Sequence, residues 1–215
     1  MAVFLNSFIP LAYNRFGRNS AINNNLPLYI DGSCRREPDF QNPSPAITQL
    51  CRPNKLVTRL NVGDLVIYIT KLGNYGNPPS HWNFIGVLEV IDFVLNHNQA
   101  EVYYLNNQIP ISQNVICNQT TPFPLNMTHG LCGFHHRNLP PHRIITLWNN
   151  GYIGRANRYP KVAITRVWKN TLNLNNPPVI THAIMNNIFG RIPGTQTPPK
   201  LTNVEWTNFK NALNI

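Results

Sequence analysis

The densest group of chemically capable side chains lies in the segment CRREPDF, residues 34–40. Arg35 and Arg36 are adjacent, and their guanidinium groups can bind phosphate or carboxylate through paired hydrogen bonds. Glu37 and Asp39 follow at once. A cluster this polar is unusual in a chain with only 8 acidic residues, so we predict a functional loop. The alternative is a surface loop whose two cations and two anions neutralise each other.

The same loop gives a specific expectation for Arg36. Glu37 is expected to pair with one arginine and to leave the other for a ligand, so that further positive charge must come from elsewhere in the chain. The candidates for that charge are Arg52, Lys55 and Arg191. We expect Arg36→Ala to weaken ligand binding by about 1–3 kcal/mol and to disturb folding less than loss of a core residue.

A second group joins the end of a predicted strand, Thr70–Lys71, to the pair His81–Trp82. An indole ring can stack on a planar base, while hydroxyl, ammonium and imidazole groups can hydrogen-bond to its edge. We therefore predict that Trp82 stacks on a base. The residues that would bind the edge of that base are Thr70, Lys71 and His81. The competing interpretation places Trp82 over the edge of the core and Lys71 in solvent.

Basic and aromatic residues alternate in the segment WNNGYIGRANRYPK, residues 148–161. Such a mixture is typical of surfaces that follow a nucleic-acid strand. Its glycines and asparagines predict a loop, and the competing interpretation is a solvated basic loop without a ligand. The predicted contacts to the nucleic-acid backbone are Arg155, Arg158 and Lys161. A last ligand-binding candidate, Arg191, lies in the turn FGRIPGTQ at 189–196, which could instead hold the C-terminal helix in place.

Established catalytic motifs are absent, because the chain has no Walker loop, GxGxxG, HExxH or GxSxG. Catalysis by a loop carboxylate is still open, with Glu37 as acid or base and Lys71 or His81 as its partner. The cysteines form no CxxC pair, and the one metal-ligand set that can be assembled matches no zinc module, so we expect no metal and no other cofactor. Its members would be Cys117, His129, Cys132, His135 and His136.

The charge balance restricts the kind of partner. Lys and Arg total 18 against 8 acidic residues, a net charge of +10, which favours nucleic acid, nucleotides or other anions. No run of 18 apolar residues is present, so we predict no membrane-spanning segment. The first residues lack the basic n-region and cleavage site of a signal peptide, which predicts a cytoplasmic protein.

Hydrophobic patterning predicts more strands than helices. The strongest strand signal is LVIYIT at 65–70, whose continuous apolarity indicates a central strand buried on both faces. Gly86, inside the next strand, predicts a bulge or a close backbone approach. Further strands are predicted at 26–30, 84–95, 143–148 and 161–168. Helices are predicted at 97–106, at 181–189 between Thr181 and Gly190, and at 202–213 with Thr202 and Glu205 as a capping box.

These elements predict an α+β protein, a single domain over residues 1–215 that is built on a small, curved, partly open β-barrel. The first part, 1–26, reads as an irregular N-terminal segment, because it is polar and turn-prone. The last part, 181–215, is expected to pack its helices on the barrel. Proline-rich connections between the strands argue against a helical bundle.

One region also resembles a known family. The stretches YIDGSCRREPDF, ITQLCRPNKLVTRLNVGDLVIYIT and WNFIGVLEVID, within residues 29–92, are similar to the nucleotide-modification-associated-domain proteins. Those are small bacterial and phage proteins related to the PUA, ASCH, EVE and YTH domains. The resemblance implies a PUA-like barrel that holds a modified base in an aromatic-lined pocket, and a link to modified nucleotides. The stretch 106–142 has no counterpart in the resemblance.

The leading hypothesis is recognition of a modified or flipped base in nucleic acid, within a base-modification or genome-defence system. The alternative is an enzyme acting on a nucleotide or nucleobase, because ASCH-type relatives include small amidohydrolases. The resemblance then implies Lys71, Thr70 and a carboxylate, Glu37 or Glu89, as the reacting groups. A third interpretation is an interaction module whose flat basic face binds an acidic protein.

Overall fold

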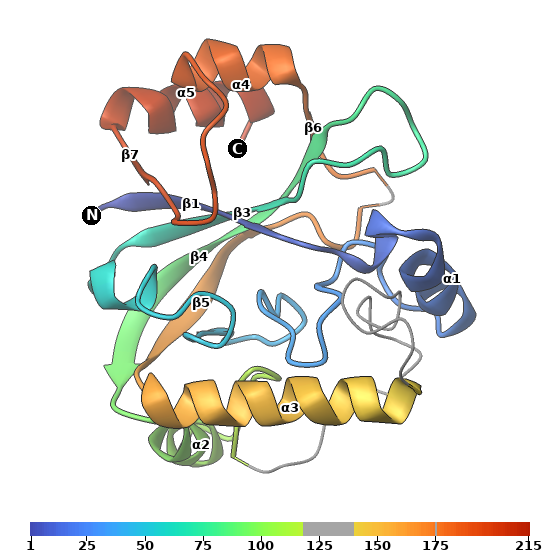
Figure 1. Cartoon of the computed structure of the whole chain (residues 1–215). Helices are drawn as coiled ribbons and strands as arrows, with labels where there is room; N and C mark the ends of the chain where they lie inside the picture. Colours follow the sequence, from blue (N-terminus) through green and yellow to red (C-terminus); the bar gives the residue numbers. More distant parts are fainter. Residues whose placement is uncertain (118–139, 175) are drawn as a thin grey trace.

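A single mixed β-sheet runs through the centre of the computed structural model, which describes residues 1–117, 140–174 and 176–215. Within that part the sheet has seven strands in the order β2-β5-β4-β3-β1-β7, and β6 pairs with one end of β4 (Figure 1). The strands are β1 Val3–Phe8, β2 Ala46–Ile47, β3 Leu65–Thr70, β4 Trp82–Val94, β5 Val162–Asn170, β6 Val179–Ile180 and β7 Lys200–Leu201.

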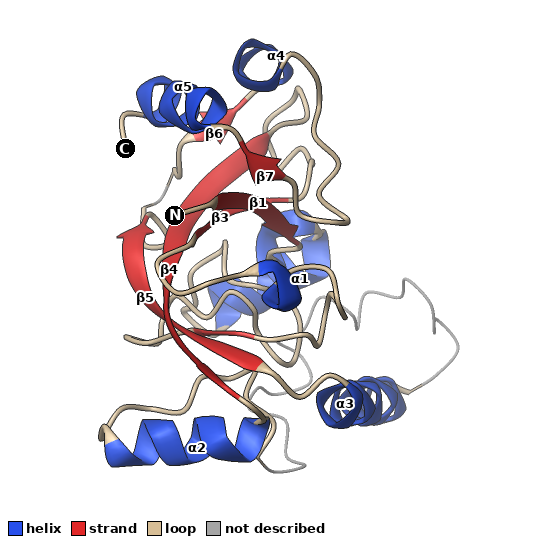
Figure 2. Ribbon diagram, turned by 90° about the vertical axis from the view of Figure 1, so that its left-hand side faces the viewer, coloured by secondary structure: helices blue, strands red, loops and turns tan. Residues whose placement is uncertain are grey.

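The sheet is strongly bent but open, as Figure 2 shows for the long strands β4 and β5. Its outer strands in the pairing order, β2 and β7, do not pair with each other in the described part of the chain, so the sheet does not close. The predicted α+β class is therefore confirmed, and the predicted partly open barrel is replaced by an open sheet. Most neighbours are antiparallel, whereas β1 and β3 run parallel.

Helices cover the sheet unequally. The helices are α1 Arg15–Asn23, α2 His97–Asn106, α3 Pro141–Arg158, α4 His182–Phe189 and α5 Asn203–Leu213, with short 3-10 turns η1 Leu11–Tyr13 and η2 Val57–Arg59. Helices α4 and α5 pack on one face through Met185, Ile188 and Phe209. On the other side, the irregular loop 31–50 lies between the sheet and α3 (Figure 1).

Strand β3 confirms the prediction of a central strand, since every one of its six residues is buried. Its side chains alternate between two cores, with Val66 and Tyr68 on the face of loop 31–50 and Ile67 on the face of the C-terminal helices. Gly86 of β4 confirms the predicted close approach. A Cβ there would lie 2.4 Å from the Lys169 carbonyl oxygen and 2.7 Å from the Phe40 ring.

The helix predictions for 97–106, 181–189 and 202–213 are also confirmed. Thr181 begins α4, where its hydroxyl accepts a hydrogen bond from the backbone of Ile184 at 3.2 Å. Gly190 ends it in the left-handed region, which glycine adopts without strain. Thr202 and Glu205 form the predicted capping box of α5. Local side-chain chemistry was sufficient to locate these helix ends.

The N-terminal part differs from its prediction. Instead of an irregular segment over 1–26, the chain forms β1, paired with both β3 and β7, and then helix α1. Residues 26–30, predicted as a strand, form turns. The polar Asn6 and Ser7 concealed β1, because the strand gains its order from pairing with β3 rather than from its own apolarity.

Residues 141–158 differ as well. The strand predicted at 143–148 lies within the 18-residue helix α3, as does the predicted loop 148–161 up to Arg158. Pro141 occupies its first turn, where proline costs no hydrogen bond. Its two glycines and several asparagines favoured a loop, but α3 packs Tyr152 and Ala156 against Cys34 and Leu50 of loop 31–50. This tertiary contact outweighs the weak helix propensity of the segment.

Candidate functional site

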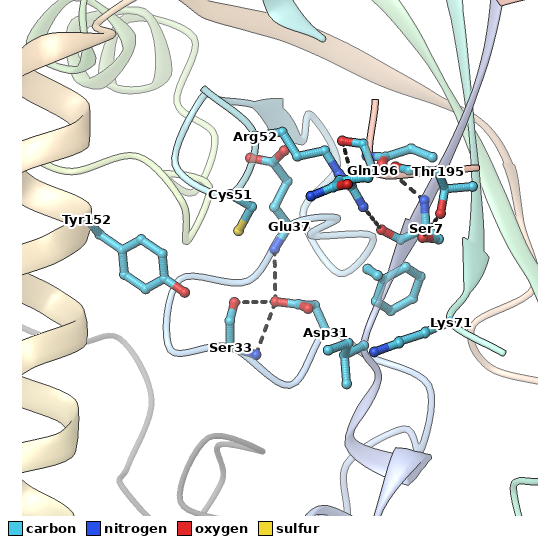
Figure 3. A pocket seen from close by; sticks show the side chains of 13 residues that line it. Ser7, Asp31, Ser33, Glu37, Cys51, Arg52, Lys71, Tyr152, Thr195 and Gln196 are labelled. Carbon is cyan, nitrogen blue, oxygen red and sulfur yellow. Dashed lines mark hydrogen bonds between the residues drawn. The ribbon is translucent and has the colours of Figure 1, made fainter. Parts of the chain in front are cut away.

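A cavity of about 430 Å³ opens where strand β1 ends (Figure 3). It is a mixed polar and aromatic space, with side chains that come from six separate parts of the chain. The lining residues are Asn6, Ser7, Phe8, Ile9, Asp31, Ser33, Glu37, Cys51, Arg52, Lys71, Tyr152, Thr195 and Gln196. The parallel pairing of β1 and β3 explains part of this set, because parallel strands end at the same edge of a sheet. Phe8 and Lys71 meet there.

Arg52 holds one wall of this cavity together. One guanidinium nitrogen, Nη1, donates to the carbonyl oxygens of Thr195 and Gln196, the second at 3.0 Å, and Nη2 donates to the Ser7 carbonyl oxygen at 2.6 Å. The Ser7 and Thr195 hydroxyls lie 2.5 Å apart. Arg52 therefore joins the end of β1 to the loop after α4, and three hydrogen bonds from its guanidinium go to backbone carbonyl oxygens.

Asp31 shapes the floor on the opposite side. Its Oδ2 accepts hydrogen bonds from the Ser33 backbone at 3.1 Å, from the Ser33 hydroxyl and from the Glu37 backbone at 3.3 Å. This is an Asx-type turn that folds the start of loop 31–50 back on itself. The turn holds the backbone of Glu37, whose side chain extends away from Asp31 toward Cys51 and Arg52 in Figure 3.

Glu37 is the most unusual group of the site, because its carboxyl is buried at the cavity wall. Oε2 accepts three hydrogen bonds, from the Thr48 backbone at 2.9 Å, the Thr48 hydroxyl at 2.5 Å and the Asn114 amide at 2.8 Å. No donor to Oε1 occurs among the described residues. Burial raises the pKa of Glu37 to about 7, although the three hydrogen bonds act in the opposite direction. Near neutral pH this carboxyl can therefore both give and take a proton.

The other three members of the predicted polar cluster lie outside the cavity. Arg35 donates from Nε and Nη2 to the Asn149 amide oxygen at 3.2 and 3.0 Å. Arg36 is buried and donates to the Asp31 carbonyl oxygen, and burial lowers its pKa to about 10. Asp39 accepts from the Gln113 backbone at 3.0 Å and the Ser112 hydroxyl at 3.3 Å, and burial raises its pKa. These side chains hold the loop.

Three of the four residues predicted to bind a base, Trp82, Thr70 and His81, do not line the cavity. Trp82 is buried in the core beneath α4, with its ring 4.9 Å from that of His182. Thr70 is fully buried, and its hydroxyl accepts from the Asn83 backbone at 2.8 Å. His81 is buried too, and its Nδ1 lies 2.9 Å from the Pro79 carbonyl oxygen. Since strand residues alternate in direction, the ends of β3 and β4 cannot present all of these side chains to one ligand.

Lys71 and Glu37, the two residues proposed for catalysis, do line the same cavity. In Figure 3 Lys71 approaches from the side of Asp31. No hydrogen bond or ion pair joins Lys71 to a carboxylate in the described part of the chain. Glu89 belongs elsewhere, because it points outward and pairs with Arg166 at 2.8 and 3.0 Å.

The four remaining predicted cations are dispersed. Arg155 donates to the Leu50 carbonyl oxygen and lies over the Tyr152 ring at 5.0 Å, so it orients the aromatic wall of the cavity. The guanidinium of Arg158 lies 5.5 Å from the ring of Tyr159. The Lys161 ammonium lies 3.9 Å from the Phe93 ring. Arg191 is exposed and precedes the wall segment of Thr195 without lining the cavity.

The sequence pattern does not predict Asp31, Tyr152 or the end of β1 as parts of the site. Two of these residues could have been recognised from the sequence: Asp31 because it opens the polar loop, and Tyr152 because it is an aromatic residue of the basic segment. Nothing in the sequence marks Ser7 or Phe8 as part of a site. They become site residues only through the parallel pairing of β1 with β3.

The possible metal-ligand set found in the sequence lies mostly outside the described residues. Of its five members, only Cys117 is among them. In the described ranges no three His, Cys, Asp or Glu side chains form a group that could hold a metal ion. Among the same residues, no helix combines the length and apolarity needed to cross a membrane. No family model, curated protein or solved structure matches the chain.

Proposed function

We propose that the cavity binds a nucleobase, presented as a nucleotide or within a nucleic acid. Its volume of about 430 Å³ falls in the range of small-molecule pockets, roughly 300–1,000 Å³. Phe8 and Tyr152 supply aromatic surface, and the amides of Asn6 and Gln196 supply both donors and acceptors. Tyr152 takes the aromatic role that the sequence suggested for Trp82.

The observation that carries this proposal is the arrangement of Glu37. Three donors fix Oε2, so the orientation of the carboxyl is set before any ligand arrives. Oε1 can then accept from an amino or ring N–H group of a base, or donate to a ring nitrogen or carbonyl when protonated. A base presents such groups along one edge of a planar ring. The fixed carboxyl of Glu37 can bind that edge while Phe8 or Tyr152 contacts the face of the ring.

The biological setting rests on the resemblance of residues 29–92 to nucleotide-modification-associated-domain proteins. It supports a base-modification or genome-defence role in a bacterial or phage system, and a modified base as the ligand. The net charge of +10 agrees with an anionic partner.

Binding of free nucleosides and nucleotides, modified and unmodified, tests the proposal by calorimetry. We expect at least one base to bind and Glu37→Gln to weaken its binding about tenfold or more, as for a buried hydrogen bond to a charged group. Glu89→Gln is the matched control, because Glu89 points away from the cavity. The proposal is wrong if no member of the panel binds, or if the two variants bind equally.

A second function is favoured by one observation, the raised pKa of Glu37 in a cavity that also contains Lys71. A carboxyl that titrates near neutral pH is suited to general acid–base catalysis, which supports an enzyme that hydrolyses an amide bond on a nucleobase. Mass spectrometry of N-acylated nucleosides incubated with the protein tests this. Glu37→Gln should abolish turnover, and a base role predicts that the rate rises with pH up to about 7.

A further inference from the structure

A second groove, of about 710 Å³, lies beside the cavity, between α1 and the loop that joins β3 to β4. Figure 1 shows α1 at the end of the sheet where β1 ends. The groove is lined by Tyr13, Asn14, Arg15, Arg18, Asn19, Leu72, Gly73, Asn74, Tyr75, Gly76 and Ser80. None of these residues belongs to a site predicted from the sequence.

The lining of this groove is positively charged. Arg15 is exposed and Arg18 is half-buried, and neither an aspartate nor a glutamate occurs among the lining residues. Arg18 is held in position, because its guanidinium donates weakly to the Ala12 carbonyl oxygen at 3.5 Å and packs beside Gly76. Gly76 has a φ of +91°, which lets the loop pass this close to the side chain. The groove therefore offers cations that its own walls do not neutralise.

Aromatic rings form the other component of the groove. Tyr75 lies at the centre of an aromatic group, with ring centroids 6.3 Å from Tyr13, 5.8 Å from Tyr29 and 5.6 Å from His81. The Tyr75 hydroxyl donates to the Lys71 carbonyl oxygen, which fixes the ring on the loop. Rigid aromatic rings beside unneutralised arginines are the combination used to hold single-stranded nucleic acid.

Lys71 connects the groove to the cavity. It lines the cavity, and its ammonium lies 5.5 Å from the ring of Tyr13, which lines the groove. The next residues, Leu72 and Gly73, already belong to the groove. If a base occupied the cavity, the sugar–phosphate backbone attached to it would pass Lys71 first and then the arginines of α1.

We propose that this groove binds the sugar–phosphate backbone of a single nucleic-acid strand, one base of which enters the cavity. Arg15, Arg18 and Lys71 contact phosphates, and Tyr75 stacks with a neighbouring base. This inference rests on the proposed function and deepens it, since it makes a polymer, rather than a free nucleotide, the ligand. It is also an alternative to the nucleic-acid path predicted along residues 148–161. The cations of that segment contact the protein itself: Arg158 and Lys161 lie over aromatic rings, and Arg155 donates to the Leu50 carbonyl oxygen.

Fluorescence anisotropy with labelled single strands of about twelve nucleotides, oligothymidylate and oligouridylate, tests the groove over about 50–200 mM KCl. Arg15→Glu should weaken binding about tenfold and lower the slope of log Kd against log salt by about 0.7 for each phosphate that the variant no longer neutralises. Lys169→Glu is the matched control. Lys169 is also exposed and undergoes the same charge change, but it lies on β5 and lines neither the cavity nor the groove.

The proposal is supported if at least one strand binds and Arg15→Glu weakens that binding while Lys169→Glu does not. The strand that binds with the higher affinity identifies DNA or RNA as the ligand. Equal weakening in both variants overturns the proposal, as does undiminished binding in Arg15→Glu, no binding of either strand at low salt, or equal binding of a polyglutamate of the same charge. The proposed function fails separately. Glu37→Gln reports on the cavity through mononucleotides, whereas Arg15→Glu should leave mononucleotide binding within about twofold of wild type.

Discussion

Loop 31–50 and the part of helix α3 from residue 148 onward both appear in the sequence as charged, turn-rich segments, but the structure uses them in opposite ways. In the loop, only residues 41 and 43 are exposed, and Arg36 is among the largest fully buried side chains of the described residues. In α3, Arg158 and its neighbours face solvent. A high density of charge therefore does not by itself indicate an exposed segment. What matters is whether the rest of the chain supplies hydrogen-bond partners.

The two segments satisfy their polar groups differently. Helix α3 bonds its backbone internally, so its backbone needs no hydrogen-bond partner from other elements except at the two ends of the helix. Loop 31–50 has almost no regular structure, and a buried loop must find a partner for each polar group. It finds them in Asn114 for Glu37, in Gln113 for Asp39 and in Asn149 for Arg35. The loop is thus a polar core, and the cavity is built on it.

The largest test of this contrast is Arg36→Ala. Removing a buried cation beside Asp31 and Asp39 should lower the free energy of unfolding by about 3 kcal/mol or more. Urea denaturation measures this, with Arg158→Ala on α3 as the control, expected within about 0.5 kcal/mol of wild type. This revises the expectation that Arg36 mainly binds ligand. Similar stability of the two variants would show that the loop is not a polar core.

The second test is the pH dependence of the free energy of unfolding, which reports on the buried Glu37 of loop 31–50. The folded Glu37 has a pKa of about 7 against an ordinary 4.5, so between these pH values the folded state holds a proton that the unfolded state lacks. Stability therefore falls as pH rises through this window, by up to about 1.4 kcal/mol per pH unit from this group. Glu37→Gln should flatten the fall measured by urea denaturation, and Glu89→Gln should not. Parallel profiles for all three proteins would contradict the assignment.

Gly86→Ala tests how tightly the loop is seated on the sheet. The added methyl group would collide with the Lys169 carbonyl oxygen and the Phe40 ring, the second of which belongs to the loop. Overpacking of this kind costs about 1–3 kcal/mol in the free energy of unfolding. Thermal denaturation should show a lower melting temperature than wild type. An unchanged value would mean that Phe40 moves away without cost, and that the loop packs loosely.

The smallest expected effect has the opposite sign. Gly154 lies within α3, and a Cβ there meets nothing within 4 Å. Gly154→Ala should therefore raise the free energy of unfolding by about 0.5–1 kcal/mol, because alanine has the higher helix propensity. The change is measurable by the same thermal melts. A destabilised Gly154→Ala would indicate that α3 is not helical at this position.

The sequence predicted the elements whose signals are local. The apolar run of 65–70, the Thr202 and Glu205 capping box, and the small residue Gly86 inside a strand each produced a correct expectation. These predictions succeeded because helix caps, strand periodicity and glycine depend on residues only a few positions apart. Glu37 and Lys71, which the sequence suggested as a pair, line the same cavity, and their role there stays a prediction.

Only the tertiary structure decided what the polar residues do. Glu37 gains its fixed orientation from Asn114, and Arg35 is held by Asn149, partners 77 and 114 residues away in the chain. Trp82 belongs to the core because α4 covers it, and Ser7 reaches the cavity because β1 pairs in parallel with β3. A side chain's type determines which hydrogen bonds it can make. Burial and distant partners determine which of them it does make, and no local pattern in a sequence encodes those.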